Sequence, residues 1–201
     1  MAGFLLANGA LGDSDGTAPI IRQKLIEQDR VEAIIVLPRE LFITTDISVT
    51  MWILNMNKKG GSYHGRRLRN REREILFMDL RQWTENPVKG EQKKKIRLVT
   101  EQIERAAAIY HTWQSEGTDG STYAEPELYR SVNLKDIEAN NFSLVPSRYI
   151  EFVDRDREID YEKVMSESAV KVADILSRQQ ANQEALEKAF AALGYKLGEK
   201  K

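Results

Sequence analysis

A strand–helix–strand pattern at the start of the chain constrains the fold more than any other feature. The apolar run Phe4–Ala7 is typical of a strand that is buried on both faces of a sheet. Thr17 can cap a following helix that carries Pro19 in its first turn. Two further apolar runs, Val31–Leu37 and Val49–Leu54, follow this helix. This succession predicts an α/β fold in which helices cover a layered sheet.

The rest of the chain divides by the length and type of its expected elements. A strand is expected at Ile75–Asp79 and a helix at residues 99–115, and shorter elements follow. A long amphipathic helix is expected to begin after Asp160 and to end at Gly194. We therefore expect three regions: a partial α/β domain at 1–98, a mixed region of helix and short strands at 99–159, and a C-terminal helix and tail at 160–201.

The C-terminal helix carries an apolar stripe with 4-3-4 spacing, which two glutamines, Gln179 and Gln183, interrupt. Such a stripe packs either on the core of its own chain or against a helix of a partner. A polar residue within a stripe is typical of a coiled coil, where it fixes the register. Both alternatives stay open. The candidate docking residues are Val172, Leu176, Leu186, Phe190 and Leu193.

The segment from Lys58 to Arg73 is strongly basic, although the net charge of the whole chain is only −1. Its seven cations accompany a single acid within the segment, Glu72. This density is typical of a surface that contacts nucleic-acid phosphates, and a solvated loop or a contact to an acidic protein are the alternatives. The candidate phosphate contacts are Lys58, Lys59, Arg66, Arg67, Arg69, Arg71 and Arg73.

The composition excludes several kinds of site. The sequence has no cysteine, which rules out disulfides, thiolate nucleophiles and cysteine-ligated metal centres. A three-histidine metal site is also impossible, because His64 and His111 are the only histidines, and we expect no metal. No apolar run approaches the roughly 18 residues that a membrane span requires. We expect a cytoplasmic protein without a membrane contact.

One aromatic residue, Phe42, follows an expected strand within a loop. An aromatic ring at a strand end can stack on a ligand ring, although packing in the core is the commoner role of such a residue. Sequence alone leaves both roles open.

Several stretches together resemble the modification (M) subunit of type I restriction–modification systems, which are adenine-N6 DNA methyltransferases. These stretches are GFLLANGAL, IIRQKLIEQDRVEAIIVLPRELFITTDISVTMWILNMNK, EILFMDLRQW and NNFSLVPSRYI. The resemblance covers about residues 2–152. It implies the C-terminal part of a Rossmann-like, S-adenosylmethionine-dependent methyltransferase sheet, beginning at the fifth strand and followed by a helical region. It also implies that Phe42 stacks on the target adenine once that base is flipped out of the duplex.

Two motifs of the family are not found in these 201 residues. Family members hold S-adenosylmethionine with a glycine-rich loop, and they bind the target amine with an Asn-Pro-Pro-Phe-type motif. No two of the five prolines here are adjacent. Methyl transfer requires the donor methyl group to be held in line with the flipped base. We therefore expect no cofactor in this chain, no catalytic residue and no activity in isolation, whereas the complete enzyme uses S-adenosylmethionine.

The resemblance also implies partners. In the family, two M subunits assemble with one specificity (S) subunit on DNA, so the C-terminal helix is the expected contact to these subunits. The strand Ala2–Ala7 pairs in the family with a neighbour that this chain does not contain. Because an unpaired strand edge invites association, we expect self-association through Ala2–Ala7 or coverage by another segment of the chain.

Three functions remain open at the level of sequence. The chain is a part of the methylating subunit, a non-catalytic protein-interaction module, or a sequence-independent nucleic-acid binder that uses the loop 58–73. The salt dependence of DNA binding separates them. Five to seven phosphate contacts would give a log–log slope of about −4 to −6 on duplex DNA.

Overall fold

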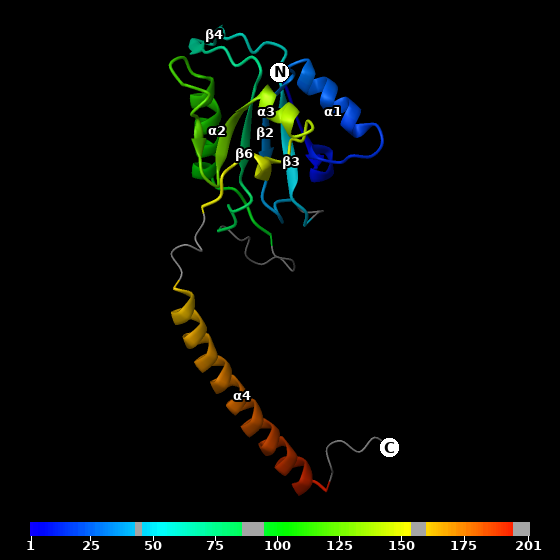
Figure 1. Cartoon of the computed structure of the whole chain (residues 1–201), viewed down its shortest axis with the longest axis vertical. Helices are drawn as coiled ribbons and strands as arrows, with labels where there is room; N and C mark the ends of the chain where they lie inside the picture. Colours follow the sequence, from blue (N-terminus) through cyan, green and yellow to red (C-terminus); the bar gives the residue numbers. More distant parts are fainter. Residues whose placement is uncertain (43–45, 86–94, 154–159, 195–201) are drawn as a thin grey trace. The chain divides into compact units, whose positions relative to one another are not determined.

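The computed structural model describes residues 1–42, 46–85, 95–153 and 160–194. The chain forms two compact units, Met1–Val153 and Asp154–Lys201, which are described separately. Figure 1 shows a sheet flanked by helices in the first unit and a single long helix in the second. None of the helices in the described residues is long and apolar enough to cross a membrane.

The first unit is built on a six-stranded mixed sheet with the strand order β1-β3-β2-β6-β8-β7. Strands β2 and β6 are parallel, and the other neighbouring pairs are antiparallel. The strands are β1 (Ala2–Ala7), β2 (Val31–Val36), β3 (Val49–Leu54), β6 (Glu74–Asp79), β7 (Ala124–Glu125) and β8 (Tyr129–Asn133). A separate hairpin joins β4 (Gly61–Tyr63) to β5 (Arg66–Leu68). The predicted α/β class and the strands expected near residues 31, 49 and 75 are confirmed.

Helices cover both faces of the sheet because the central strands β2 and β6 carry apolar residues on both of their faces, with buried Glu32 as the polar exception in the interior of β2. Along β2, Ile34 packs in the cluster on one face, and Ile35 packs in the cluster on the other. The first face is covered by α1 (Ala18–Glu27), α3 (Leu134–Ala139) and the segment 142–150. The second face is covered by α2 (Thr100–Gln114). This pattern of burial is what a strand in the middle of an α/β sheet requires.

The first strand differs from its prediction. Residues Ala2–Ala7 form β1, but only Phe4 is half-buried, while Leu5 and Leu6 are exposed. The expectation of burial on both faces is wrong, because β1 is the terminal strand of the described sheet and pairs there on one side only, with β3.

Two of the three residues expected at helix ends cap their helix as predicted, and the third does not. Asp160 accepts a hydrogen bond from the backbone N–H of Lys163 and caps α4 (Tyr161–Ala192). Gly194 follows α4 with a φ of +79°, the left-handed conformation that favours glycine. Thr17 precedes α1, but its side chain makes no capping hydrogen bond.

The contacts group residues 1–153 into one unit. Strands β7 and β8, which lie within the expected middle region 99–159, belong to the same sheet as β1, β2, β3 and β6. Two further short 3-10 turns, Asn8–Leu11 and Pro146–Arg148, complete the described elements of this unit.

Candidate functional site

The loop with Phe42 and the basic segment lie at opposite ends of the sheet. Strands β1, β2 and β6 all run in the same direction, since β1 and β2 are both antiparallel to β3 and β6 is parallel to β2. Their carboxyl ends therefore meet at one end of the sheet, where the loop with Phe42 begins. The basic segment follows β3 and lies at the opposite end, where Figure 1 shows the β4–β5 hairpin. Six-residue strands separate these ends by roughly 20 Å.

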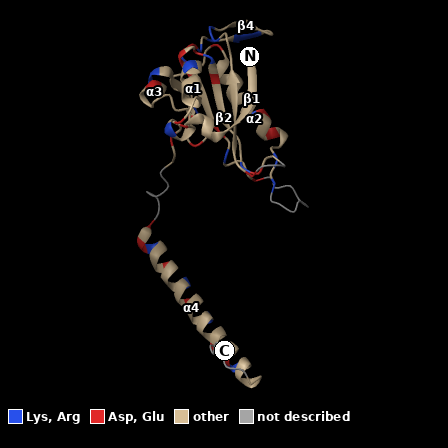
Figure 2. Cartoon of the chain, turned by 90° about the vertical axis from the view of Figure 1, so that its right-hand side faces the viewer, with Lys and Arg blue, Asp and Glu red and all other residues tan. Residues whose placement is uncertain are grey.

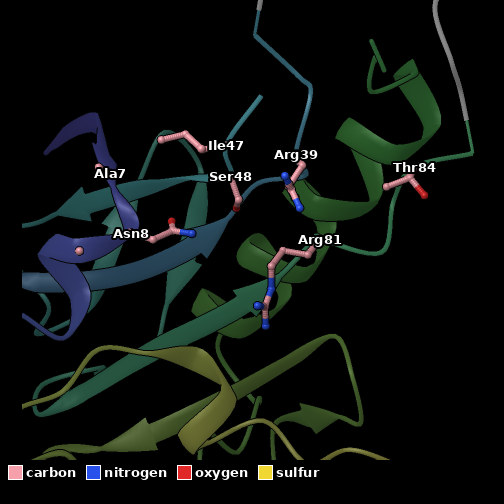
Figure 3. A pocket seen from close by; sticks show the side chains of 8 residues that line it. Ala7, Asn8, Arg39, Ile47, Ser48, Arg81 and Thr84 are labelled. Atoms are coloured by element: carbon pink, nitrogen blue, oxygen red, sulfur yellow. The ribbon is translucent and has the colours of Figure 1, made fainter. Parts of the chain in front are cut away.

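A pocket of about 540 Å³ lies at the carboxyl ends of β1, β2 and β6. Figure 3 shows Asn8 on one side of this pocket and Arg39 and Arg81 on the other. In open α/β sheets, ligands bind at this end of the strands. The lining residues are Ala7, Asn8, Gly9, Arg39, Ile47, Ser48, Arg81 and Thr84.

Hydrogen bonds fix several polar groups of the pocket. Asn8 Oδ1 accepts a bond of 2.7 Å from the hydroxyl of buried Thr50. The hydroxyl of Ser48 donates to the carbonyl of Leu37 at 2.6 Å. Arg81 binds both carboxylate oxygens of Asp79, with distances of 2.5–3.0 Å. This hydrogen bonding raises the pKa of Arg81, so its guanidinium is held charged and in place.

Phe42 lies near this end of the sheet but is half-buried. Its ring packs against the cluster on the α2 face of the sheet. Its carbonyl accepts a hydrogen bond of 2.9 Å from Lys95 Nζ, which also binds the carboxylate of Asp46 at 2.6 Å. Lys95 therefore holds both described ends of the loop that contains Phe42. The core role and the stacking role that the sequence left open are both compatible with a ring that is covered in part.

Three of the seven expected phosphate contacts form ion pairs in which the cation is buried, as for Lys58 and Arg71, or half-buried, as for Arg69. Lys58 has 1% of its side chain exposed and binds Asp29 Oδ1 at 2.5 Å. Its burial lowers the pKa of its amine, while the bond to Asp29 opposes this shift. Arg69 binds Glu74 through two nitrogens at 2.7 and 3.1 Å. Both charges face carboxylates of the same chain, and the phosphate contacts expected of Lys58 and Arg69 stay a prediction.

Arg71 is the third, and it belongs to a buried network around Glu32. Both side chains are at most 1% exposed, and Arg71 Nε donates to Glu32 Oε1 at 3.0 Å. Glu32 also accepts bonds from Gln114 at 3.1 Å and from Asn55 at 2.5 Å. Burial and the charge of Glu32 raise the pKa of the nearby Tyr110 phenol. The arginine therefore joins the basic segment to β2 and α2, and phosphate cannot reach it in this structure.

The four remaining cations of the segment are more accessible. Arg67 and Arg73 form exposed pairs with Glu116 at 3.4 Å and with Glu138 at 3.7 Å. Half-buried Arg66 donates to the ring and carbonyl of His111, and Lys59 is exposed. Figure 2 shows the cationic residues of the hairpin in blue. Within the described residues, five of the seven cations thus have carboxylate partners, so the positive surface is smaller than the sequence predicts.

The second unit presents the expected stripe on α4. Taken by itself, this helix buries none of its own side chains. The exposed fractions of the five candidate docking residues are 53% for Val172, 58% for Leu176, 50% for Leu186, 38% for Phe190 and 72% for Leu193. A single helix has no core of its own, so both alternatives for its stripe, packing on the same chain or against a partner helix, stay open.

Sequence reasoning missed three polar residues of the pocket: Asn8, Arg39 and Arg81. Each follows the carboxyl end of a strand by one to three residues. Because such positions gather at one end of a parallel arrangement, the strand directions could have found them. Sequence alone did not give those directions.

Comparison with known proteins identifies relatives of this chain. Residues 1–158 match the family described as N-6 DNA Methylase. The HindI methylase subunit of Haemophilus influenzae, a type I restriction enzyme component, is 33% identical over 150 residues, which are 73% of this chain and 29% of that protein. The MjaIX methylase subunit of Methanocaldococcus jannaschii is 26% identical over 200 residues, 96% of this chain and 32% of its own length. The chain thus spans about a third or less of the length of these relatives.

A solved structure shows the same fold. The methyltransferase subunit of a type I restriction–modification system from Streptococcus thermophilus superposes with a TM-score of 0.56 at 19% identity, over 75% of this chain and 26% of that one. At this identity the likeness concerns the fold alone. The family match extends over more than three quarters of the 201 residues, and the chain therefore belongs to the N-6 DNA methylase family.

Proposed function

We propose that these residues form part of the methylating (M) subunit of a type I restriction–modification system. In this role they provide one wall of the site for the target adenine and a helix for subunit docking. The observation that carries the proposal is the family match over residues 1–158, which includes every strand around the carboxyl-end pocket. The relatives from Haemophilus influenzae and Methanocaldococcus jannaschii are methylase subunits of type I restriction enzymes.

The proposed base contact is Phe42. Its loop leaves β2 at the end of the sheet where ligands bind, and Lys95 fixes the backbone of that loop. Stacking of a base on an aromatic ring is worth roughly 1–3 kcal/mol. Phe42 would add this stabilisation to a flipped adenine, while contacts elsewhere supply the affinity for the duplex.

The methyl donor is proposed to bind outside these 201 residues. The sequence has neither adjacent prolines nor the amine-binding motif that contains them. S-adenosylmethionine would thus be held by other parts of the complete enzyme, and the chain alone would not methylate DNA. A Rossmann-like arrangement of the whole sheet belongs to this proposal as well.

The proposed partners of α4 are the S subunit and the second M subunit. The stripe from Val172 to Leu193 is exposed along the helix and has the seven-residue periodicity of a coiled-coil seam. The exposed edge strand β1 is a second surface for association, in the isolated chain with another copy of itself.

A test of docking uses the purified S subunit of the same system and size-exclusion chromatography. Leu176→Asp, which places a charge on the stripe, should abolish co-elution with the S subunit. Val170→Asp is the matched control, because Val170 is also apolar and exposed but lies off the stripe. Equal co-elution of both variants would remove α4 from the proposal, and failure of the unchanged chain to co-elute would remove the subunit assignment.

A second candidate function is a non-catalytic interaction module. The observation in its favour is the pairing of five of the seven basic-segment cations with carboxylates. If only the four accessible cations contacted phosphates, the log–log slope of duplex-DNA affinity against salt concentration would be no steeper than about −3.6. Seven contacts would give a steeper slope. The module would show no measurable DNA binding even at low salt.

A further inference from the structure

The pocket at the carboxyl ends of β1, β2 and β6 gathers donor groups from three separate loops. Asn8 follows β1, Arg39 follows β2 and Arg81 follows β6. We propose that these three side chains bind a phosphate of a nucleotide in the DNA strand, so that this pocket rather than the basic hairpin is a backbone contact. The inference rests on the proposed function and locates one DNA contact of the proposed methylating subunit in this pocket.

The hydrogen bonds already made in the pocket leave donors directed toward a ligand. Because Asn8 Oδ1 accepts from Thr50, the amide is turned so that Nδ2 faces the other way, toward the arginines, as Figure 3 shows. Arg81 uses Nε and one terminal nitrogen on Asp79. Asp79 is 7% exposed, so the pair holds the guanidinium at the rim, where 45% of the Arg81 side chain is exposed.

Arg39 adds the most accessible charge. Its side chain is exposed, and its Nε donates to the carbonyl of Asp46 at 3.4 Å, which is a long hydrogen bond. This contact engages a backbone carbonyl through Nε and leaves the terminal nitrogens extending into the pocket region seen in Figure 3. Arginine is suited to phosphate because its planar fork can donate two parallel hydrogen bonds.

The chemistry of the lining selects an anion that accepts hydrogen bonds. Two guanidinium groups and an amide NH₂ are all donors, and the hydroxyl hydrogen of Ser48 is directed to Leu37. A volume of about 540 Å³ exceeds what a phosphate alone would fill. The apolar atoms of Ala7 and Ile47 would border the sugar or base of the same nucleotide. These features together match a nucleotide unit.

The exposure of the cations at the two ends of the sheet also favours the pocket as the phosphate site. At the other end of the sheet, Lys58, Arg69 and Arg71 have at most 11% of their side chains exposed, whereas Arg81 keeps 45% exposed although it also pairs with a carboxylate. A phosphate bound at Arg39 would lie at the same end of the sheet as the loop of Phe42, whereas a phosphate at the hairpin would lie roughly 20 Å away. A base at Phe42 and the phosphate of the same or the next nucleotide could therefore both be contacted at the carboxyl end of the sheet, but not at Phe42 and the hairpin together.

The first arm of the test locates the ligand by NMR. The isotopically labelled chain is titrated with deoxyadenosine 5′-monophosphate and, separately, with deoxyadenosine. We expect the monophosphate to shift the amide signals of Asn8, Ser48 and Thr84, and deoxyadenosine at the same concentration to leave them in place. Equal shifts with both compounds, or none with the monophosphate at millimolar concentration, would overturn the phosphate site.

The second arm measures binding to a fluorescent 20-base-pair duplex by anisotropy. Arg39→Gln should raise the Kd about tenfold at low salt and flatten the log–log salt slope by about 0.9. Arg67→Gln is the matched control, an exposed arginine of the hairpin, and should change the Kd less than twofold. Identical losses in both variants would contradict the inference. If the unchanged chain binds no duplex while the monophosphate still shifts the three amides, the phosphate site stands and the proposed DNA role fails.

Discussion

Replacement of Arg71 by methionine tests whether the basic segment serves the fold rather than a ligand. Arg71 lies between Glu32, to which its Nε donates at 3.0 Å, and the ring of Trp113, whose centre is 5.9 Å from its guanidinium carbon. Methionine keeps much of the volume but leaves the fully buried Glu32 carboxylate without its cation. Loss of one partner from a buried pair costs about 3–5 kcal/mol.

The lower end of this range is expected, because Gln114 and Asn55 still donate to Glu32. For a urea dependence of about 2 kcal/mol per molar, a loss of about 3 kcal/mol lowers the unfolding midpoint by about 1.5 M. The assay is urea unfolding followed by tryptophan fluorescence and circular dichroism. Arg67→Met is the control, since exposed substitutions usually change stability by less than about 0.5 kcal/mol.

A second variant separates the charge from the packing. Glu32→Gln combined with Arg71→Met removes the buried charge and keeps one acceptor oxygen, for either Gln114 or Asn55. The double variant should therefore be more stable than Arg71→Met alone. The reasoning is refuted if Arg71→Met unfolds at the same urea concentration as the Arg67→Met control, and above all if it loses DNA affinity while its stability is unchanged.

The other predictions concern separate parts of the chain. In a complete methyltransferase that contains this chain, Phe42→Ala should lower the methylation rate about tenfold or more and leave the duplex Kd nearly unchanged; equal rates would contradict the stacking role. Leu5→Lys on the exposed edge strand should reduce self-association of the isolated chain in sedimentation velocity, and a strict monomer before the change would contradict the expectation. Burial raises the pKa of Tyr149 to about 12, so stability that is complete below pH 10 should fall as the pH rises toward 12, and Tyr149→Phe should weaken this dependence in urea titrations.

The central part of the fold was predictable because its signal is local. Apolar residues 33–36 and 75–78 alternate between the two faces of their strands, and the structure buries both faces. The caps of α4 were predictable for the same reason, since Asp160 and Gly194 act on their own neighbours.

The charges of the basic segment were not predictable in this way. Glu72 is the only acid within residues 58–73, but the carboxylates that neutralise the segment come from distant positions, such as Glu32 and Glu116. A count of charges along the chain cannot detect partners that only the folded sheet brings near. Burial of β1 was overpredicted because an apolar run does not show how many neighbours its strand has.

The pocket needed both the strand directions and the order of the sheet. Asn8 and Arg81 are more than 70 residues apart, and neither lies in a recognisable motif. They border one pocket because β1 and β6 end on the same side of the sheet.

The central claim is that this chain supplies surfaces for DNA and for partner subunits but has no site for the methyl donor. It is tested most directly by incubating the purified 201-residue chain with S-adenosylmethionine and duplex DNA, and then measuring N6-methyladenine in the digested DNA by mass spectrometry. The account predicts none above the level of a reaction without protein. Methyladenine that accumulates with time and with the amount of chain would contradict it.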